Sequence, residues 1–300
     1  MTDPSSSDSD ATLDFTGERF TPECVREIWY EHWHRYVFAL PLARGRRVLD
    51  AACGEGYGSA LLASTARTVT GVDVDAQTIA HARRRYGDAG DTGNLNFQCA
   101  SVTAIDAPDA SFDLIVSFET IEHLAEHEQM LAEFDRLLAP GGLLLISSPD
   151  RDNYNAAGVA NPFHVRELDR DEFDGLLGRH FPHRRLFGQR LGFHSVVWSL
   201  DAHGPNADGV AGPAQASRLD TGSGQLMPGP MAAPMYYLAA CARHGADLPA
   251  MPDLSLFSDE QQSVYSHYNN EIRRVIAGGH RILELERELA ELKAGRDEPR

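Results

Sequence analysis

Three side chains that can bind a metal ion or move a proton stand close together in the run Glu119-Thr-Ile-Glu122-His123. Positions i, i+3 and i+4 share one face of a helix, so these side chains are predicted to converge. Two carboxylates and an imidazole form a mixed oxygen and nitrogen donor set suited to Mg²⁺, Mn²⁺, Fe²⁺ or Zn²⁺. A fourth ligand, His164, is available downstream. The sequence therefore predicts a metal site formed by Glu119, Glu122, His123 and His164.

The same segment also supports two interpretations without a metal. His123, with Glu122 beside it, can act as a general base, which contributes about 10² to 10⁴ in rate. Alternatively, the imidazole caps and orients the start of a helix. Glu122 and His123 are accordingly the candidate catalytic residues, with or without the ion.

A glycine-rich loop lies upstream, where an apolar strand runs into Asp50-Ala-Ala-Cys-Gly54-Glu-Gly56-Tyr-Gly58. Alternating glycines before a helix are typical of a nucleotide pocket, because they let the backbone take positive φ and approach a ligand closely. The spacing departs from the dinucleotide pattern G-x-G-x-x-G, which would need glycine at Ser59. Asp50 also disfavours a pyrophosphate, whereas Asp73, at the end of the next strand, is placed to bind ribose hydroxyls. A nucleoside that carries positive charge fits best, ahead of a nicotinamide dinucleotide or a turn without ligand.

The elements that position these residues alternate between strands and helices. Continuous apolar runs separated by helical segments predict a parallel sheet covered on both faces. Five strands are expected at 48–52, 68–73, 95–99, 113–118 and 142–147. Helices are expected at 57–66, 76–86 and 121–138, and weaker strands at 185–190 and 235–241. The predicted fold class is α/β, a Rossmann-like, doubly wound, seven-stranded and mostly parallel sheet.

With these motifs, the chain resembles the class I S-adenosylmethionine-dependent methyltransferases from about Phe15 to His244. The resemblance implies a loop that holds the methionine end of the cofactor and an acidic residue, Asp73, on its ribose. Ser101 stands where the family usually carries an acidic residue beside the adenine. The family's N-terminal segment, here an aromatic-rich helix opened by Thr21-Pro22, commonly covers the cofactor and would place Arg35 near the methionine carboxylate. The implied cofactor-binding residues are Arg35, Asp50, Ala52, Gly54, Gly56, Tyr57, Asp73, Val74, Ser101, Val102 and Phe118.

The metal-site pattern looks like that of the ubiquinone-pathway O-methyltransferases and of the small-RNA 2′-O-methyltransferases. The whole-chain pattern, including Gly17-Glu-Arg-Phe20 and Phe187-Gly-Gln-Arg190, is more similar to bacterial methyltransferases of sugar and polysaccharide biosynthesis. These resemblances imply O-methylation of a small-molecule or sugar hydroxyl, with Mg²⁺ or Mn²⁺ assisting. The alternatives are a metal-independent N- or O-methyltransferase that uses His123 as base, an RNA 2′-O-methyltransferase, and a cofactor-binding protein that organises a biosynthetic complex.

The amino-acid composition limits the classes of partner that the protein is expected to bind. The 300 residues include 42% hydrophobic residues, enough for one main α/β core, and carry a net charge of −17. Such a surface repels nucleic acid and counts against an RNA acceptor. No apolar run is long enough to cross a membrane, and the polar start lacks the features of a signal peptide, so a cytoplasmic protein is expected. The four cysteines form no C-x-x-C pair and are expected to be reduced.

The chain is expected to divide into a disordered tail (1–14), a methyltransferase domain (15–245) and a C-terminal helical extension (246–300). A Gly- and Pro-rich stretch at 202–234 is predicted to be a flexible insertion in the domain. In the extension, Gly278-Gly279 predicts a hinge or a break. The following apolar residues repeat at spacings 3, 4 and 3, which suits either a short coiled coil in a homodimer or packing on the domain: Ile282, Leu285, Leu289 and Leu292.

Overall fold

The computed structural model describes residues 27–87, 93–154, 161–195, 217–220, 222–228 and 233–296. The predicted tail at 1–14 and the expected helix start at Thr21-Pro22 lie outside these residues. The α-helices are α1 (Glu27–Ala43), α2 (Tyr57–Ala63), α3 (Ala76–Ala82), α4 (His127–Leu137), α5 (Arg151–Tyr154), α6 (Arg170–His180) and α7 (Ser263–Arg296). The strands are β1 (Arg47–Ala51), β2 (Thr68–Asp73), β3 (Leu95–Cys99), β4 (Phe112–Ser117), β5 (Leu138–Pro149), β6 (His183–Gln189), β7 (Ser217–Leu219), β8 (Leu226–Pro228) and β9 (Tyr236–Ala242).

Seven strands form one sheet in the order β3-β2-β1-β4-β5-β9-β6. The first five pair in parallel, whereas β9 runs antiparallel to both β5 and β6. This arrangement confirms the predicted α/β, seven-stranded, mostly parallel sheet. The carboxyl ends of the parallel strands therefore meet at one edge, which is where open sheets of this kind bind ligands.

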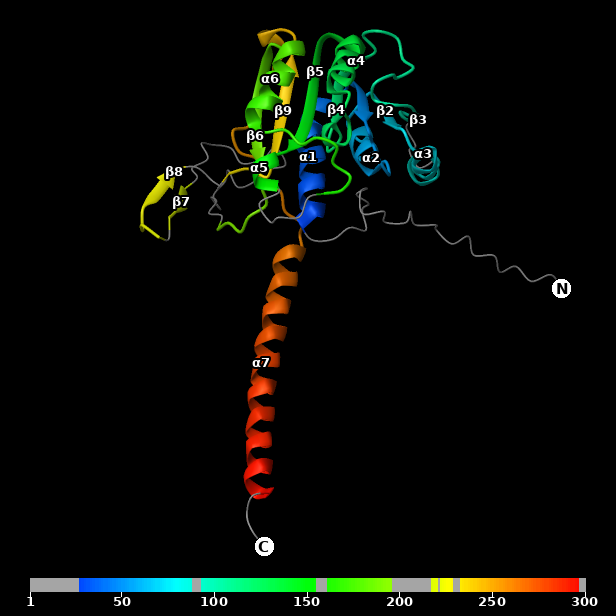
Figure 1. Cartoon of the computed structure of the whole chain (residues 1–300). Coiled ribbons are helices and arrows are strands. Elements are labelled where there is room, and N and C mark those ends of the chain that lie inside the picture. The colour runs from blue at the N-terminus through cyan, green and yellow to red at the C-terminus, as the bar shows by residue number, and fades with distance from the viewer. Residues whose placement is uncertain are drawn as a thin grey trace, which may run out of the picture.

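Helices cover both faces of this sheet (Figure 1). Successive residues of β5 divide between the faces: Leu143 and Leu145 pack with α1 and α2, whereas Leu144 and Ile146 pack with α4 and α6. Both faces are buried because side chains alternate along a strand. The α1 helix thus provides the predicted N-terminal helical cover and carries Arg35 over the domain.

Two local predictions differ from the structure. The single helix expected at 121–138 is instead a short 3₁₀ turn at Ile121–His123, a break, and then α4. The segment after Gly278-Gly279 is neither hinged nor broken, since α7 runs continuously through both glycines. The stretch at 202–234, predicted to be a flexible insertion, lies largely outside the described residues, and its described part contains the paired strands β7 and β8.

Within the described residues, no helix is both long and apolar enough to cross a membrane. The three cysteines in this part of the chain, Cys53, Cys99 and Cys241, are free thiols.

Candidate functional site

The glycine loop between β1 and α2 owes its shape to residues with positive φ. Gly54 has φ 54°, Gly56 has φ 96°, and Ala52 takes a φ of 63° that is uncommon for a residue with a side chain. A Cβ on Gly56 would lie 2.9 Å from the ring of Phe97. Glycine is therefore favoured at both positions, because the backbone of the loop takes left-handed conformations and packs tightly against β3.

Asp50 lies under this loop and is completely buried. Ser59 Oγ donates a hydrogen bond to its carboxylate at 2.6 Å, and the Tyr36 hydroxyl donates another at 3.1 Å. Burial raises the pKa of Asp50 to about 6, against the opposing effect of these hydrogen bonds. Asp50 is thus a buried acidic residue whose hydrogen bonds connect β1 with α2 and with α1.

Glu55, between the loop glycines, is a buried residue that the sequence interpretation missed. Its carboxylate is 2.8 Å from Arg85 Nη1 and 3.2 Å from His81 Nε2, and it accepts hydrogen bonds from the Tyr86 hydroxyl. These partners come from α3 and the turn after it. The available signal in the sequence was an acidic residue flanked by two glycines of the loop.

The rim of the candidate nucleoside site is formed where β2 and β3 end. Asp73 accepts hydrogen bonds from the Gly54 amide at 3.1 Å and the Asp75 amide at 2.9 Å, one on each oxygen. A carboxylate oxygen has a second acceptor site, so both remain able to bind hydroxyls. Val74 exposes 74% of its surface beside Asp73, which offers an apolar face. Ser101 donates to or accepts from Thr103 Oγ1 at 2.8 Å, and Val102 is buried behind it.

Two further predicted cofactor contacts, Tyr57 and Phe118, are buried and pack against the ring of Tyr36. They shape the wall between α1 and the sheet.

Arg35 reaches the sheet from α1 and is buried to 1% exposure. Its Nε donates to Gln189 Oε1 at 2.8 Å, and its guanidinium carbon lies 4.4 Å from the centre of the Tyr236 ring. Nη2 is 3.4 Å from Glu119 Oε1, but neither terminal nitrogen makes a hydrogen bond within the described residues. A buried guanidinium in this condition retains capacity for an anionic ligand.

The predicted metal ligands do not all converge. One ligand atom each from Glu122, His123 and His164 lies within 4.8 Å of the others, as close as the ligands of one ion. Glu119 is turned away: it accepts a hydrogen bond from Ser147 Oγ at 2.9 Å and pairs with Arg35. The reason is local, since Glu119 has a φ of 50° and the chain does not form the helical turn that the i, i+3, i+4 spacing assumes.

The two imidazoles of this trio are held by carbonyl and carboxylate groups. His123 Nδ1 is 3.0 Å from the Phe163 carbonyl oxygen, which can only accept, so Nδ1 carries the proton. His164 Nδ1 is 2.5 Å from Glu167 Oε1, and Asn161 Nδ2 lies 3.0 Å from His164 Nε2. Both rings therefore present Nε2 as the nitrogen with a lone pair, the arrangement common among metal-binding histidines.

Glu122 supplies the carboxylate of the trio and is 1% exposed. Within the described residues, neither of its oxygens has a hydrogen-bond partner. Burial first, and the charge of Glu119 second, raise the pKa of Glu122 well above its usual value. Such a group is costly unless a proton or a cation satisfies it. The Glu122 carbonyl, in turn, accepts from the Val165 and Arg166 amides at 2.8 and 3.1 Å, which brings the His164 loop to the trio.

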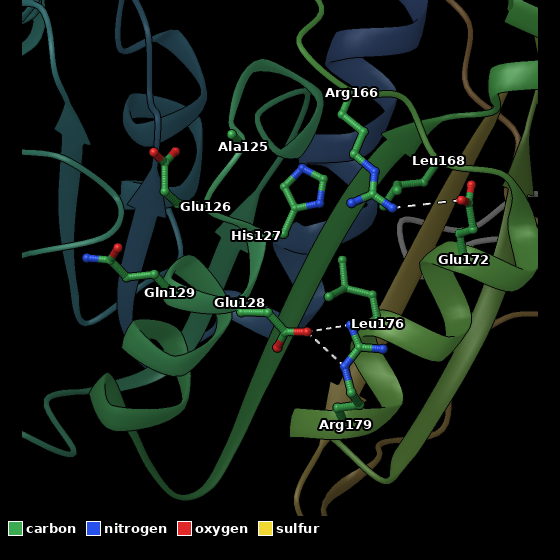
Figure 2. A pocket seen from close by; sticks show the side chains of 10 residues that line it. All are labelled: Ala125, Glu126, His127, Glu128, Gln129, Arg166, Leu168, Glu172, Leu176 and Arg179. Carbon is green, nitrogen blue, oxygen red and sulfur yellow. Dashed lines mark hydrogen bonds and ion pairs between the residues drawn. The ribbon is translucent and has the colours of Figure 1, made fainter.

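A cleft of about 400 Å³ lies nearby between α4 and α6 (Figure 2). An ion pair between Glu128 and Arg179 bridges it, and His127 lies between this ion pair and Ala125. None of the predicted site residues lines this cleft. It is thus a groove between two helices, separate from the glycine loop and from the trio.

Comparison with known proteins agrees with this geometry. Residues 49–146 match the methyltransferase domain family. A probable S-adenosylmethionine-dependent methyltransferase of Mycolicibacterium smegmatis is 39% identical over 171 residues, which cover 56% of this chain and 64% of that protein. A ubiquinone biosynthesis O-methyltransferase of Coxiella burnetii is 30% identical over 118 residues, 39% of this chain and 50% of that protein. The chain thus spans less than two thirds of either relative.

Among solved structures, the YcgJ protein of Bacillus subtilis shares the fold, with a TM-score of 0.50 and 18% identity over 71% of this chain and all of that one. The segment at residues 49–146 thus matches the methyltransferase domain family, and over about half of its length the chain is similar to proteins named as probable S-adenosylmethionine-dependent methyltransferases.

Proposed function

We propose that this protein transfers the methyl group of S-adenosylmethionine to a hydroxyl oxygen of a small molecule or a sugar, with the help of a divalent metal ion. The observation that carries the proposal is Glu122, a buried carboxylate without a hydrogen-bond partner in the described chain, grouped with two imidazoles. This group follows β4 and β5 at the same carboxyl edge as the glycine loop. The donor site and the activating site are therefore neighbours in the fold.

The residues around the glycine loop fit the cofactor. S-adenosylmethionine supplies an electrophilic methyl carbon on a positively charged sulfur. The loop gives the backbone room for close approach, and Asp73 keeps acceptor capacity for ribose hydroxyls while exposed Val74 offers an apolar contact for the base. The unbonded terminal nitrogens of Arg35 suit the methionine carboxylate. Asp50 contributes negative charge beneath the loop without direct exposure to the ligand.

The trio fits a divalent ion. Such an ion supplies Lewis acidity that lowers the pKa of an alcohol, which is otherwise far above neutral. Glu122 would neutralise part of the charge of the ion. The Nε2 atoms of His123 and His164 would provide the other two protein ligands, for which the Asn161 amide would have to move away from His164 Nε2. The three ligands comprise two nitrogen donors and one carboxylate. This set favours Mn²⁺ over Mg²⁺, because Mg²⁺ prefers oxygen ligands.

His123 acting alone is the alternative mechanism that a specific contact favours. The hydrogen bond from its Nδ1 to the Phe163 carbonyl fixes the tautomer in which Nε2 can receive a proton. A general base of this kind suffices for a phenol or an amine but is modest for a sugar hydroxyl. An RNA acceptor is disfavoured by the net charge of −17.

A release assay for S-adenosylhomocysteine, run over panels of sugars, phenols and amines, tests the proposal. We expect turnover with a hydroxyl acceptor, loss of turnover in excess chelator, and recovery with Mn²⁺. Glu122→Ala and His123→Ala should lose bound metal and turnover together. Unchanged turnover in excess chelator would reject the metal and leave His123 as base, whereas a methylated amine as product would reject O-methylation.

A further inference from the structure

The long helix α7 leaves the domain soon after its first turns (Figure 1). Its start is anchored, because Val264 is buried and the rings of Tyr265 and Tyr268 pack near Phe193. From Ile272 to Leu289 all the side chains are exposed. At about 1.5 Å per residue, its 34 residues span roughly 50 Å, far more than the anchored part requires.

Seven large apolar residues project from the free part of α7. Their exposed fractions range from 46% to 73%: Ile272, Val275, Ile276, Ile282, Leu283, Leu285 and Leu289. Solvent does not stabilise such a surface on an isolated helix, and the domain does not cover it. The α7 seam, defined as Val275, Gly278, Ile282, Leu285 and Leu289, has spacings of 3, 4, 3 and 4. Spacings of three and four keep a seam on one side of a helix and are typical of coiled coils.

The two glycines in α7 face open space within the part of the chain that the structure describes. A Cβ on either Gly278 or Gly279 would meet nothing within 4 Å. Gly278 lies in the seam and Gly279 lies beside it. The absence of side chains there lets a partner helix approach closely.

The charges on α7 favour a second copy as the partner. Between residues 269 and 289 the helix carries four arginines and four glutamates, whereas the whole chain has a net charge of −17. Two copies can therefore meet along this segment without the repulsion that their domains would cause. With Ile282 in the first seam position of a heptad, Arg281 flanks it and faces Glu286 of a parallel partner. A β-branched residue at that position, followed by leucine at Leu285, favours two strands.

We infer that α7 is a dimerisation helix, in which residues 272–289 of two copies pair as a short parallel coiled coil. The inference does not depend on the proposed acceptor or metal. It places two methyltransferase domains at the same end of one stalk.

Sedimentation equilibrium of the full chain, over concentrations of about 1 to 100 µM, tests the pairing. We expect a species of twice 32.9 kDa that dissociates on dilution. Ile282→Glu should weaken the dimer at least about tenfold, because it places a charge in the seam. The matched control is Ala277→Glu, which puts the same side chain on the opposite face with Asn270 and Glu284 and should change the dissociation constant less than about twofold.

Cross-linking tests the orientation. In a parallel pair, Leu285→Cys places two thiols face to face, so oxidation should give a covalent dimer, whereas Ala277→Cys should not exceed the background set by exposed Cys99. A monomer throughout the concentration range, a trimer or tetramer, or a dimer unaffected by Ile282→Glu would each overturn the inference. Binding of the monomer to anionic vesicles through α7 would overturn it as well. Unchanged binding of S-adenosylhomocysteine by Ile282→Glu confirms that the domain remains folded.

Discussion

Glu167 Oε1 lies 2.5 Å from His164 Nδ1, and their side chains are only 8% and 7% exposed. The carboxylate thus fixes both the direction and the tautomer of the His164 imidazole, one of the three side chains of the trio. Partners of this kind raise the basicity of a metal-binding histidine.

Glu167→Gln is expected to weaken Mn²⁺ binding by about 10- to 100-fold, because the amide no longer orients and polarises the ring as a carboxylate does. Paramagnetic resonance of free Mn²⁺ measures the dissociation constant. Glu128→Gln is the control, since Glu128 is an exposed acid paired with Arg179 and His180. Equal Mn²⁺ affinity in the two variants would mean that Glu167 has no part in holding an ion.

Glu119 and Glu122 should differ sharply, although the sequence suggests equal roles. Glu119→Gln keeps the trio intact, so Mn²⁺ affinity should change by less than about threefold, whereas Glu122→Gln removes the only carboxylate of the trio and should lower affinity by at least about 100-fold. The same resonance titration compares them. A comparable loss in both variants would restore the four-ligand site predicted from spacing.

Asp50 predicts a pH dependence of stability in the ligand-free protein. Its pKa is raised from 3.8 to about 6, so the folded state holds the proton more tightly than the unfolded state. The unfolding free energy should therefore be greatest below pH 3.8 for this group and fall as pH rises through about 6, by about 3 kcal/mol. Urea unfolding of the wild type and Asp50→Asn from pH 4 to pH 7 isolates this contribution. A difference between the two proteins that does not vary with pH would contradict it.

Gly58 and Gly175, both in helices, predict opposite effects of alanine. A Cβ on Gly58 would lie 2.0 Å from the Tyr36 ring, so Gly58→Ala should destabilise the fold by about 1 to 3 kcal/mol. Gly175 in α6 has nothing within 4 Å, and Gly175→Ala should stabilise by up to about 1 kcal/mol. Urea midpoints measure both. Stabilisation by Gly58→Ala would show that Tyr36 does not rest on the glycine loop.

The sheet and its glycine loop could be predicted because their signals are local. Each parallel strand is a continuous apolar run, and the loop carries its conformational requirement in its own glycines. The positions of Asp50 and Asp73 at the same edge of the sheet could be predicted because each residue stands at the end of a predicted parallel strand. The seven-stranded sheet with one antiparallel strand agrees with that interpretation.

The site was predicted less completely because its geometry depends on contacts between distant segments. The helix expected at 121–138 is interrupted where the Glu122 carbonyl accepts amides from Val165 and Arg166, more than 40 residues away. No spacing within the first segment reveals such a contact, so Glu119 was assigned to the metal. The contact between Glu167 and His164 was missed for a different reason. Their spacing of three is visible in the sequence, but nothing in the predicted loop indicates that the two side chains contact each other.

Gly278 and Gly279 show that a low helix propensity does not by itself end a helix. Glycine in a helix interior costs roughly 1 kcal/mol relative to alanine, which weakens a helix without forbidding it. The flanking residues of α7 are mostly good helix formers, and the helix continues through the pair.

Calorimetric titration with S-adenosylhomocysteine tests the central claim, that the glycine loop and Asp73 hold a methyl donor, most directly. One site per chain is predicted, and Asp73→Asn should weaken binding by about 10- to 100-fold through loss of charged hydrogen bonds, whereas Asp106→Asn, an exposed control, should leave it unchanged. A folded wild-type chain that gives no heat of binding, or an Asp73→Asn variant that binds as tightly, would contradict the account.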